Sequence, residues 1–179
     1  MLKSLLVPVF VLVFSIPALA HSPWGQYQVY RQMHLLIMST IPDSPTYPYS
    51  NKIVKAINEI IPKAKARPAR AKTFERVHSL FKTKQIQLEL LSKINAKALL
   101  EGSTPFSGLG PVEAKLLYVF GDLLLLVQND FPDSNVWLLA DALIKIHNRL
   151  PGALTPQQIM EMPNLHPSAL LAFRGNPIP

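Results

Sequence analysis

The stretch His34–Ile61, HLLIMSTIPDSPTYPYSNKIVKAINEII, joins three kinds of local sequence that together decide the fold. Its first part, Leu35–Met38, is a short apolar run of the kind that forms a buried strand. Its middle, Thr40–Tyr49, holds three prolines and several hydroxyl groups, which is typical of a loop. From Ser50 onward, apolar residues recur at helical spacing up to Ile61. This order predicts an α/β fold, in which the N–H groups and hydroxyls at a helix start can receive an anionic ligand.

Past this stretch, short apolar runs again alternate with helical patterns. The apolar run Leu116–Gln128 could form one buried helix, but Gly121-Asp122 interrupts it and its second half suits a buried strand. We expect further strands at 66–71, 86–91 and 123–127. We also expect three helices: one capped by Thr73 that ends at Lys84, one over Ile94–Leu100, and a long one over Asn135–Leu150. The helix over Ile94–Leu100 would start at a Ser92 cap and stop at Gly102. A proline-rich tail follows, with a helical turn at Pro156–Met160. The fold class predicted is a single α/β domain with a mostly parallel sheet flanked by helices.

The N-terminus, MLKSLLVPVFVLVFSIPALA, has the pattern of a secretory signal peptide. One lysine precedes an apolar run, and small residues at 18–20 form a cleavage site. A membrane anchor is the alternative, but the run Leu5–Ile16 is shorter than the roughly 20 residues of a spanning helix. We therefore predict a signal peptide over 1–20, cleavage after Ala20 and a domain over 21–179. Because the chain has no cysteine, an exported protein of this kind fits a bacterial periplasm.

The composition limits the chemistry. Without cysteine there is no disulfide, thiolate nucleophile, zinc knuckle or iron–sulfur cluster. The formal charge is +7, and much of the excess lies between Lys63 and Lys84. A nucleic-acid surface, a solvated face, and attraction of anionic solutes or lipid head groups are three interpretations of this charge. The solvated face is favoured, and no nucleic-acid partner is expected, since aromatic residues are not interleaved with the basic ones.

No motif of a catalytic site appears. The chain lacks a G-x-S-x-G elbow and a P-loop, and we expect neither enzymatic activity nor a cofactor. The glutamates, Glu89 among them, are scattered and are interpreted as charges on helix faces or strand ends. His21 would become the N-terminal residue and could chelate copper with a second histidine, yet no other histidine has a diagnostic spacing. No metal site is therefore predicted.

The order of these segments resembles the TAXI family (TRAP-associated extracytoplasmic immunogenic proteins), solute-binding subunits of tripartite transporters. The resemblance rests on Ser39-Thr40 followed by SPTYP at 44–48, on the segment 83–90, on the apolar segments within 114–128, and on the tail. In the tail, FPD at 131–133 precedes VWLLADAL at 136–143, and LTP at 154–156 and LHPSA at 165–169 follow in order.

The resemblance implies a periplasmic-binding-protein fold, here one lobe where the family has two in about twice the length. It implies transporter membrane subunits as partners and a small anionic solute, a carboxylate or an amino acid, as ligand. Family ligand contacts fall on Ser39, Thr40, Ser44, Thr46 and Tyr47. Arg70 joins this set because Arg67, Arg70 and Lys72 lie at the end of the second strand, next to the first loop, where they could clamp an anion.

Two alternatives stay open at this point. In the first, Asp43, Ser44 and Ser50 simply form turns and a helix cap. In the second, Arg67, Arg70 and Lys72 form a strand end that faces solvent and binds no anion. The chain also departs from the family in its length and in its stiff loop Pro42–Pro45, which carries a carboxylate. The second functional hypothesis is therefore a non-catalytic accessory or scaffold protein of a periplasmic membrane complex that has lost ligand binding.

Overall fold

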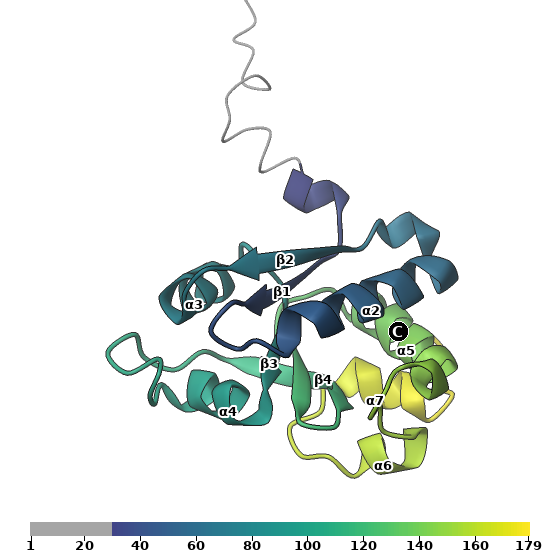
Figure 1. Cartoon of the computed structure of the whole chain (residues 1–179). Coiled ribbons are helices and arrows are strands. Elements are labelled where there is room, and N and C mark those ends of the chain that lie inside the picture. Colours follow the sequence, from purple (N-terminus) through teal and green to yellow (C-terminus); the bar gives the residue numbers. More distant parts are fainter. Residues whose placement is uncertain (1–29) are drawn as a thin grey trace, which may run out of the picture.

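The computed structural model describes residues 30–179 (Figure 1). The predicted signal peptide and His21 lie outside the described residues. Within them, strands alternate with helices over most of the chain, so the α/β class is confirmed. No helix of the described part is long and apolar enough to cross a membrane.

Five strands form one sheet in the order β2-β1-β3-β5-β4. They are β1 (Leu36–Thr40), β2 (Arg67–Ala71), β3 (Leu88–Ser92), β4 (Ala114–Phe120) and β5 (Leu123–Gln128). β1 pairs in parallel with β2 and β3, while β5 pairs antiparallel with both β3 and β4. Four strands therefore run in one direction and β5 alone runs in the other, which confirms a mostly parallel sheet.

The reversal of β5 follows from a two-residue link. Gly121 and Asp122 join β4 to β5, and Gly121 has a φ of 59°, a left-handed conformation that glycine adopts without a steric penalty. A link this short can join only antiparallel strands. The interpretation of Leu116–Gln128 as one buried helix is thus wrong, and the expected strand at 123–127 belongs to a hairpin.

Helices cover both faces of the sheet (Figure 1). α2 (Thr46–Ile60) and α5 (Asp133–Ile146) lie on one face, and α3 (Phe74–Lys82) and α4 (Lys93–Glu101) lie on the other. The remaining helical elements are η2 (Pro62–Ala64), η3 (His147–Arg149), α6 (Pro156–Met160) and α7 (Pro167–Phe173). α7 packs against α5, and its existence was not predicted.

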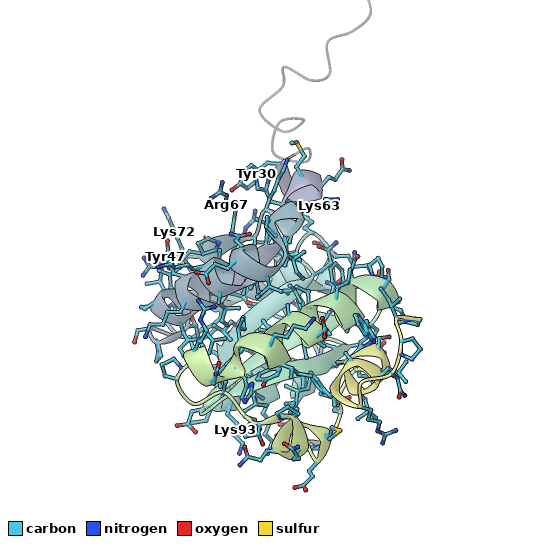
Figure 2. The ribbon with its side chains drawn as sticks, turned by 90° about the vertical axis from the view of Figure 1, so that its right-hand side faces the viewer. Tyr30, Tyr47, Lys63, Arg67, Lys72 and Lys93 are labelled. Atoms are coloured by element: carbon cyan, nitrogen blue, oxygen red, sulfur yellow. The ribbon has the colours of Figure 1, made fainter. Side chains whose placement is uncertain are left out.

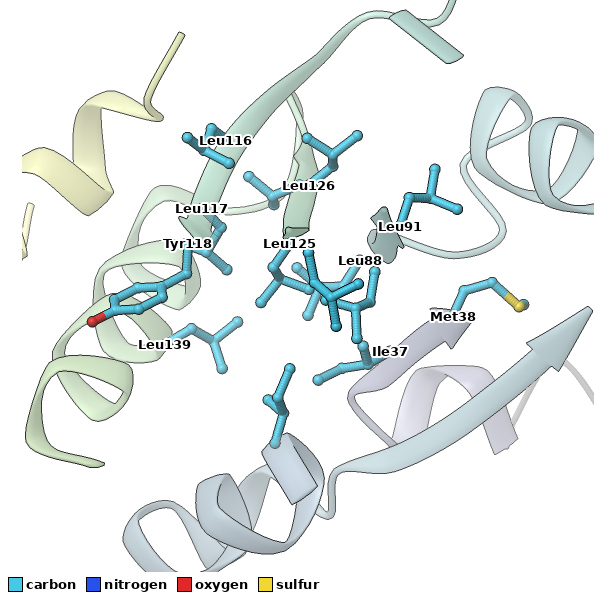
Figure 3. Close-up of a cluster of buried hydrophobic side chains, with 14 of the residues drawn as sticks. Ile37, Met38, Leu88, Leu91, Leu116, Leu117, Tyr118, Leu125, Leu126 and Leu139 are labelled. Atoms are coloured by element: carbon cyan, nitrogen blue, oxygen red, sulfur yellow. The ribbon is translucent and has the colours of Figure 1, made fainter. Parts of the chain in front are cut away.

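Apolar side chains fill the space between these layers (Figure 3). Ile37, Leu88 and Leu125 point from neighbouring strands toward α2 and α5, where Leu139 meets them. Met38, the neighbour of Ile37, is also buried but lies on the α3 and α4 side, because successive strand residues alternate between the two faces. The central strands are consequently apolar on both faces, which is the usual pattern of a sheet covered by helices.

Several predicted boundaries differ from the structure at the ends of helices. α2 begins at Thr46 rather than Ser50, so the first loop is only Ile41–Pro45 and Ser50 is no cap. Pro48 lies in the first turn of α2, where its missing N–H costs nothing because early helical N–H groups have no intrahelical partner. α5 likewise begins at Asp133, ahead of the predicted start.

Two local signals were interpreted correctly. The Thr73 hydroxyl accepts a hydrogen bond from the Arg76 N–H at 3.2 Å and caps α3. Gly102 ends α4 with a φ of 67°. Ser92 occupies the N-cap position of α4 as expected, but its side chain makes no capping bond.

The two outer strands of the sheet are protected in different ways. Beside β2, the Asn58 side chain accepts the N–H of Ala66 at 2.7 Å and donates to the carbonyl oxygen of Ala66 at 3.0 Å. Pro68, within β2, has no N–H that another strand could bind. Beside β4, the tail covers the edge, since the His166 N–H donates to the Leu116 carbonyl oxygen at 2.9 Å. Both devices reduce pairing with other chains.

Gly102 allows a direct test of this packing. A Cβ at this position would lie 2.8 Å from the Pro111 nitrogen and 2.9 Å from the Gly110 carbonyl carbon. We expect Gly102→Ala to lower the free energy of unfolding by about 2–4 kcal/mol, because backbone strain and a backbone clash act together. Urea denaturation measures the change.

Gly108→Ala is the matched control for this prediction. Gly108 has a φ of +85° but nothing within 4 Å of its would-be Cβ, so only the backbone strain of about 1–2 kcal/mol should appear. Equal losses in the two variants would contradict the close approach of Pro111 to Gly102.

Candidate functional site

The predicted ligand residues come together at the carboxyl ends of β1 and β2, around the loop Ile41–Pro45. We call this region the strand-end site. In open α/β sheets this edge is where ligands usually bind. The parallel pairing of β1 with β2 places Ser39 opposite Arg70 and Thr40 opposite Ala71, and α2 starts directly above them.

Three of the predicted hydroxyls are buried and bonded to the main chain. Ser39, Thr40 and Thr46 have no exposed surface. The Ser39 hydroxyl donates to the Ala69 carbonyl oxygen at 3.0 Å, and the Thr46 hydroxyl donates to the Asp43 carbonyl oxygen at 2.7 Å. These side chains hold the loop against the strands.

The other three predicted residues reach the surface. Ser44 and Arg70 are exposed, and Tyr47 is half-buried at the start of α2. The guanidinium carbon of Arg70 lies 4.6 Å from the centre of the Tyr47 ring, a cation–π contact between β2 and α2. The structure thus brings Tyr47 and Arg70 together, and they are the predicted residues that can meet a ligand or a partner from outside.

Asp43, which the sequence interpretation treated as a turn former, makes a long-range contact at the start of α4. It is 5% exposed, and its Oδ2 accepts a hydrogen bond from the Ser92 N–H at 2.7 Å. Ser92 is the N-cap of α4, where the helix dipole and free N–H groups attract an anion. The chain therefore supplies its own carboxylate to this helix start.

Glu89 lies in β3 with no exposed surface, so its interpretation as a strand-end charge is wrong. Among the described residues, neither of its carboxyl oxygens has a hydrogen-bond partner. Burial, and secondarily the charge of Asp43, raise the pKa of Glu89 well above its ordinary value of 4.5. A carboxyl in this environment favours its protonated form.

Gln128 adds a second buried polar group on the same face of the sheet. Glu89 is paired with Leu126 across β3 and β5, so Gln128 lies two residues further along that face. Its side-chain nitrogen donates to the Phe81 carbonyl oxygen in α3, and its oxygen has no partner among the described residues. The α3 and α4 face thus holds three unpartnered oxygen atoms inside the protein.

The histidines of the described region have structural contacts. His166 accepts a hydrogen bond from the Ser168 N–H at 3.2 Å and caps α7, and burial lowers its pKa. His78 bonds the Gly110 carbonyl oxygen at 2.8 Å. Within residues 30–179 no group of three or more histidine, aspartate or glutamate side chains is placed to hold a metal ion.

No protein-family model matches this chain, and a search of curated proteins finds no relative. The relation to the TAXI family accordingly stays a prediction that rests on the sequence segments alone.

Removing the Asp43 carboxylate tests its bond to α4. We expect Asp43→Ala to lower the free energy of unfolding by about 1.5–3 kcal/mol, the range for a hydrogen bond to a charged group. Asp43→Asn keeps an acceptor for the Ser92 N–H and should lose less. Denaturant titration of both variants measures this. Equal losses would show that a neutral amide oxygen cannot replace the carboxylate, and no loss in either variant would contradict a stabilising bond to the Ser92 N–H.

The Glu89 carboxyl predicts a specific pH dependence. Because its folded pKa is raised, its favourable contribution is complete below the unfolded value near 4.5 and is lost as pH rises through the folded pKa. Glu89→Gln cannot ionise and does not lose this contribution. The difference in unfolding free energy between Glu89→Gln and the native chain should therefore shift in favour of the variant as pH rises above about 4.5. The total shift is up to about 1.4 kcal/mol for each unit by which folding raises the pKa of Glu89. Parallel stability curves from pH 4 to 9 would rule out a raised pKa.

Proposed function

We propose that this protein is an exported, non-catalytic accessory protein, a single α/β lobe that docks on an acidic partner in the periplasm, such as a subunit of a membrane complex. The N-terminal pattern at 1–20 supports export. The exposed residues of the strand-end site and of β2 support docking through surface charge.

The observation that carries this proposal is the contact between Asp43 and the start of α4. A solute carboxylate would bind at such a helix start, and the Asp43 carboxylate already accepts the Ser92 N–H there at 2.7 Å. The hydroxyls of Ser39, Thr40 and Thr46 are likewise occupied by main-chain bonds. What the strand-end site presents to solvent is a shallow cationic and aromatic surface.

The cations of this surface continue along β2. We call Lys65, Arg67, Arg70 and Lys72 the basic edge; all four are exposed, and Figure 2 shows Arg67 and Lys72 on the same side of the molecule as Tyr47. Within the described residues none of them lies within 4.0 Å of a carboxylate. Unneutralised charge of one sign attracts a partner of the opposite sign and speeds its association.

A second candidate function is solute binding of the TAXI type, with transporter membrane subunits as partners. The observation in its favour is the Tyr47–Arg70 pair, which could bind a small carboxylate or amino acid through the guanidinium. Such a ligand would be held shallowly, because Arg70 is exposed and Tyr47 is half-buried at the surface of the described domain.

One pair of measurements separates the two candidates. Fluorescence anisotropy with labelled poly-L-glutamate reports docking of an acidic chain, and thermal shift with glutamate and citrate reports solute binding. For an accessory protein we expect poly-L-glutamate to bind in a salt-dependent way, about fivefold more weakly to the double variant Arg67→Gln/Arg70→Gln, with no thermal shift from the small anions.

Arg174→Gln is the control, since Arg174 is exposed at the end of α7, away from β2. If it weakens poly-L-glutamate binding as much as the double variant does, the binding is nonspecific and the docking proposal fails. A thermal shift with glutamate or citrate that disappears in Arg70→Gln would instead support solute binding, since a ligand at 100 times its Kd adds about 2.7 kcal/mol.

A further inference from the structure

A cavity of about 490 Å³ lies at the opposite edge of the sheet from the strand-end site. Residues 31–35 ahead of β1, the turn Ile61–Ala64 after α2, and the first half of α5 surround it. Parallel strands begin at this edge, so the cavity lies away from the predicted ligand set at the other end of the strands. Its lining contains no residue of the basic edge, although the Arg67 N–H bonds the carbonyl oxygen of Leu35, which lines the cavity. Its volume lies within the range of about 300–1,000 Å³ that small-molecule pockets have.

The cavity has an apolar floor, and part of its rim is apolar. Leu139 and Phe131 are buried beneath it. Met33 and Leu138 also line it and are 52% and 39% exposed, so apolar surface faces water at the mouth of the cavity. A ligand with a hydrocarbon or aromatic body would remove this surface from water, at a gain of roughly 25 cal/mol per Å².

The charges at the cavity have one sign. Arg31 and Lys63 line it beside His34, and among residues 30–179 no aspartate or glutamate lines it. Arg31 is positioned by a hydrogen bond from its guanidinium to the Gln85 side-chain oxygen at 2.6 Å. The His34 Nδ1 donates to the Tyr30 carbonyl oxygen at 2.9 Å, which leaves Nε2 of the same ring for other partners. Within residues 30–179 no carboxylate lies within 4.0 Å of Lys63.

We propose that this cavity binds a small amphiphilic anion, one molecule with an apolar body on the Leu138–Leu139 side and an acidic head group at Lys63 and Arg31. The apolar lining selects against fully polar solutes such as citrate, and the cationic rim selects against neutral and cationic amphiphiles. This site goes beyond the proposed docking function and does not depend on it, because it shares no residue with the basic edge.

Isothermal titration of the purified protein with decanoate tests the proposal. Decanol and decyltrimethylammonium are the probes with the same chain and a neutral or positive head group. We expect saturable 1:1 binding of decanoate with a negative heat-capacity change, and at least tenfold weaker binding of the other two. Binding of decanol as tight as that of decanoate would overturn the role of the cations.

Variants locate the site. Lys63→Gln should weaken decanoate about fivefold, and Leu138→Glu, which adds a carboxylate to the rim, should weaken it more than tenfold and improve decyltrimethylammonium. Both side chains are exposed, so neither change should prevent folding. Lys93→Gln is the matched control at the other end of the molecule (Figure 2). An equal loss in Lys93→Gln would overturn the proposal.

Two further measurements distinguish the cavity from the basic edge and from a lipid-binding surface. Arg70→Gln, at the far end of β2 from the cavity, should leave decanoate binding unchanged. Failure of the docking function and failure of this cavity can therefore be told apart. Sedimentation with phosphatidylglycerol vesicles distinguishes a free ligand from a membrane surface. Binding to vesicles without binding of decanoate would overturn the proposal in favour of a lipid surface.

Discussion

The hydrogen bond from the Ser92 N–H to the Asp43 carboxylate joins the two connections on which the sheet depends. Asp43 follows β1 and Ser92 ends β3, and these two strands pair in parallel at the centre of the molecule. Parallel strands need long crossovers, so their register is defined by contacts far apart in sequence rather than by a turn. A charged acceptor at the start of α4 both satisfies that helix and holds the first loop close to β3.

This arrangement has a consequence for the strand beneath it. β3 is covered by helices on both faces and paired on both sides, so Glu89 has no route to water. The Asp43 charge nearby disfavours a second ionised carboxyl, which adds to the effect of burial in raising the pKa of Glu89. Buried carboxyls without partners cost stability, and their retention in natural proteins is often connected with function. Glu89 thus marks the α3 and α4 face as different from the apolar core on the other side.

The molecule offers two surfaces with different chemistry at opposite edges of one sheet. At the strand-end site, the Asp43 carboxylate accepts the Ser92 N–H at the start of α4, and the exposed surface is a shallow group of cations with one aromatic ring. The edge where the parallel strands begin contains a cavity with apolar walls and a cationic rim. Exposed cations of the described residues thus occur both at a shallow surface, which suits a macromolecule, and around a recess, which suits a small molecule. Both proposals use attraction of anions, and they differ in whether apolar surface is buried on binding.

Signals that act within a few residues could be interpreted before the structure. Thr73 is such a case, since its hydroxyl caps α3 by accepting the N–H of Arg76, only three residues further along the chain. The start of α2 was placed too late because Pro48 was counted among the prolines of the loop Thr40–Tyr49, although the first turn of a helix tolerates proline. Asp43 could not be assigned to α4, because its partner lies 49 residues away. The cavity could not be predicted at all, since its lining comes from segments as distant as 31–35 and 131–139.

The sequence by itself determined the α/β class, most of the strands and helices, and the absence of cysteine chemistry, because periodicity, caps and composition are local properties. The tertiary structure alone decided that the hydroxyls of Ser39, Thr40 and Thr46 face the main chain, and that Asp43 occupies the start of α4. The physical reason is burial. A polar side chain takes its partner from whatever element packs beside it, and that element is selected by strand order and helix packing rather than by neighbours in the chain.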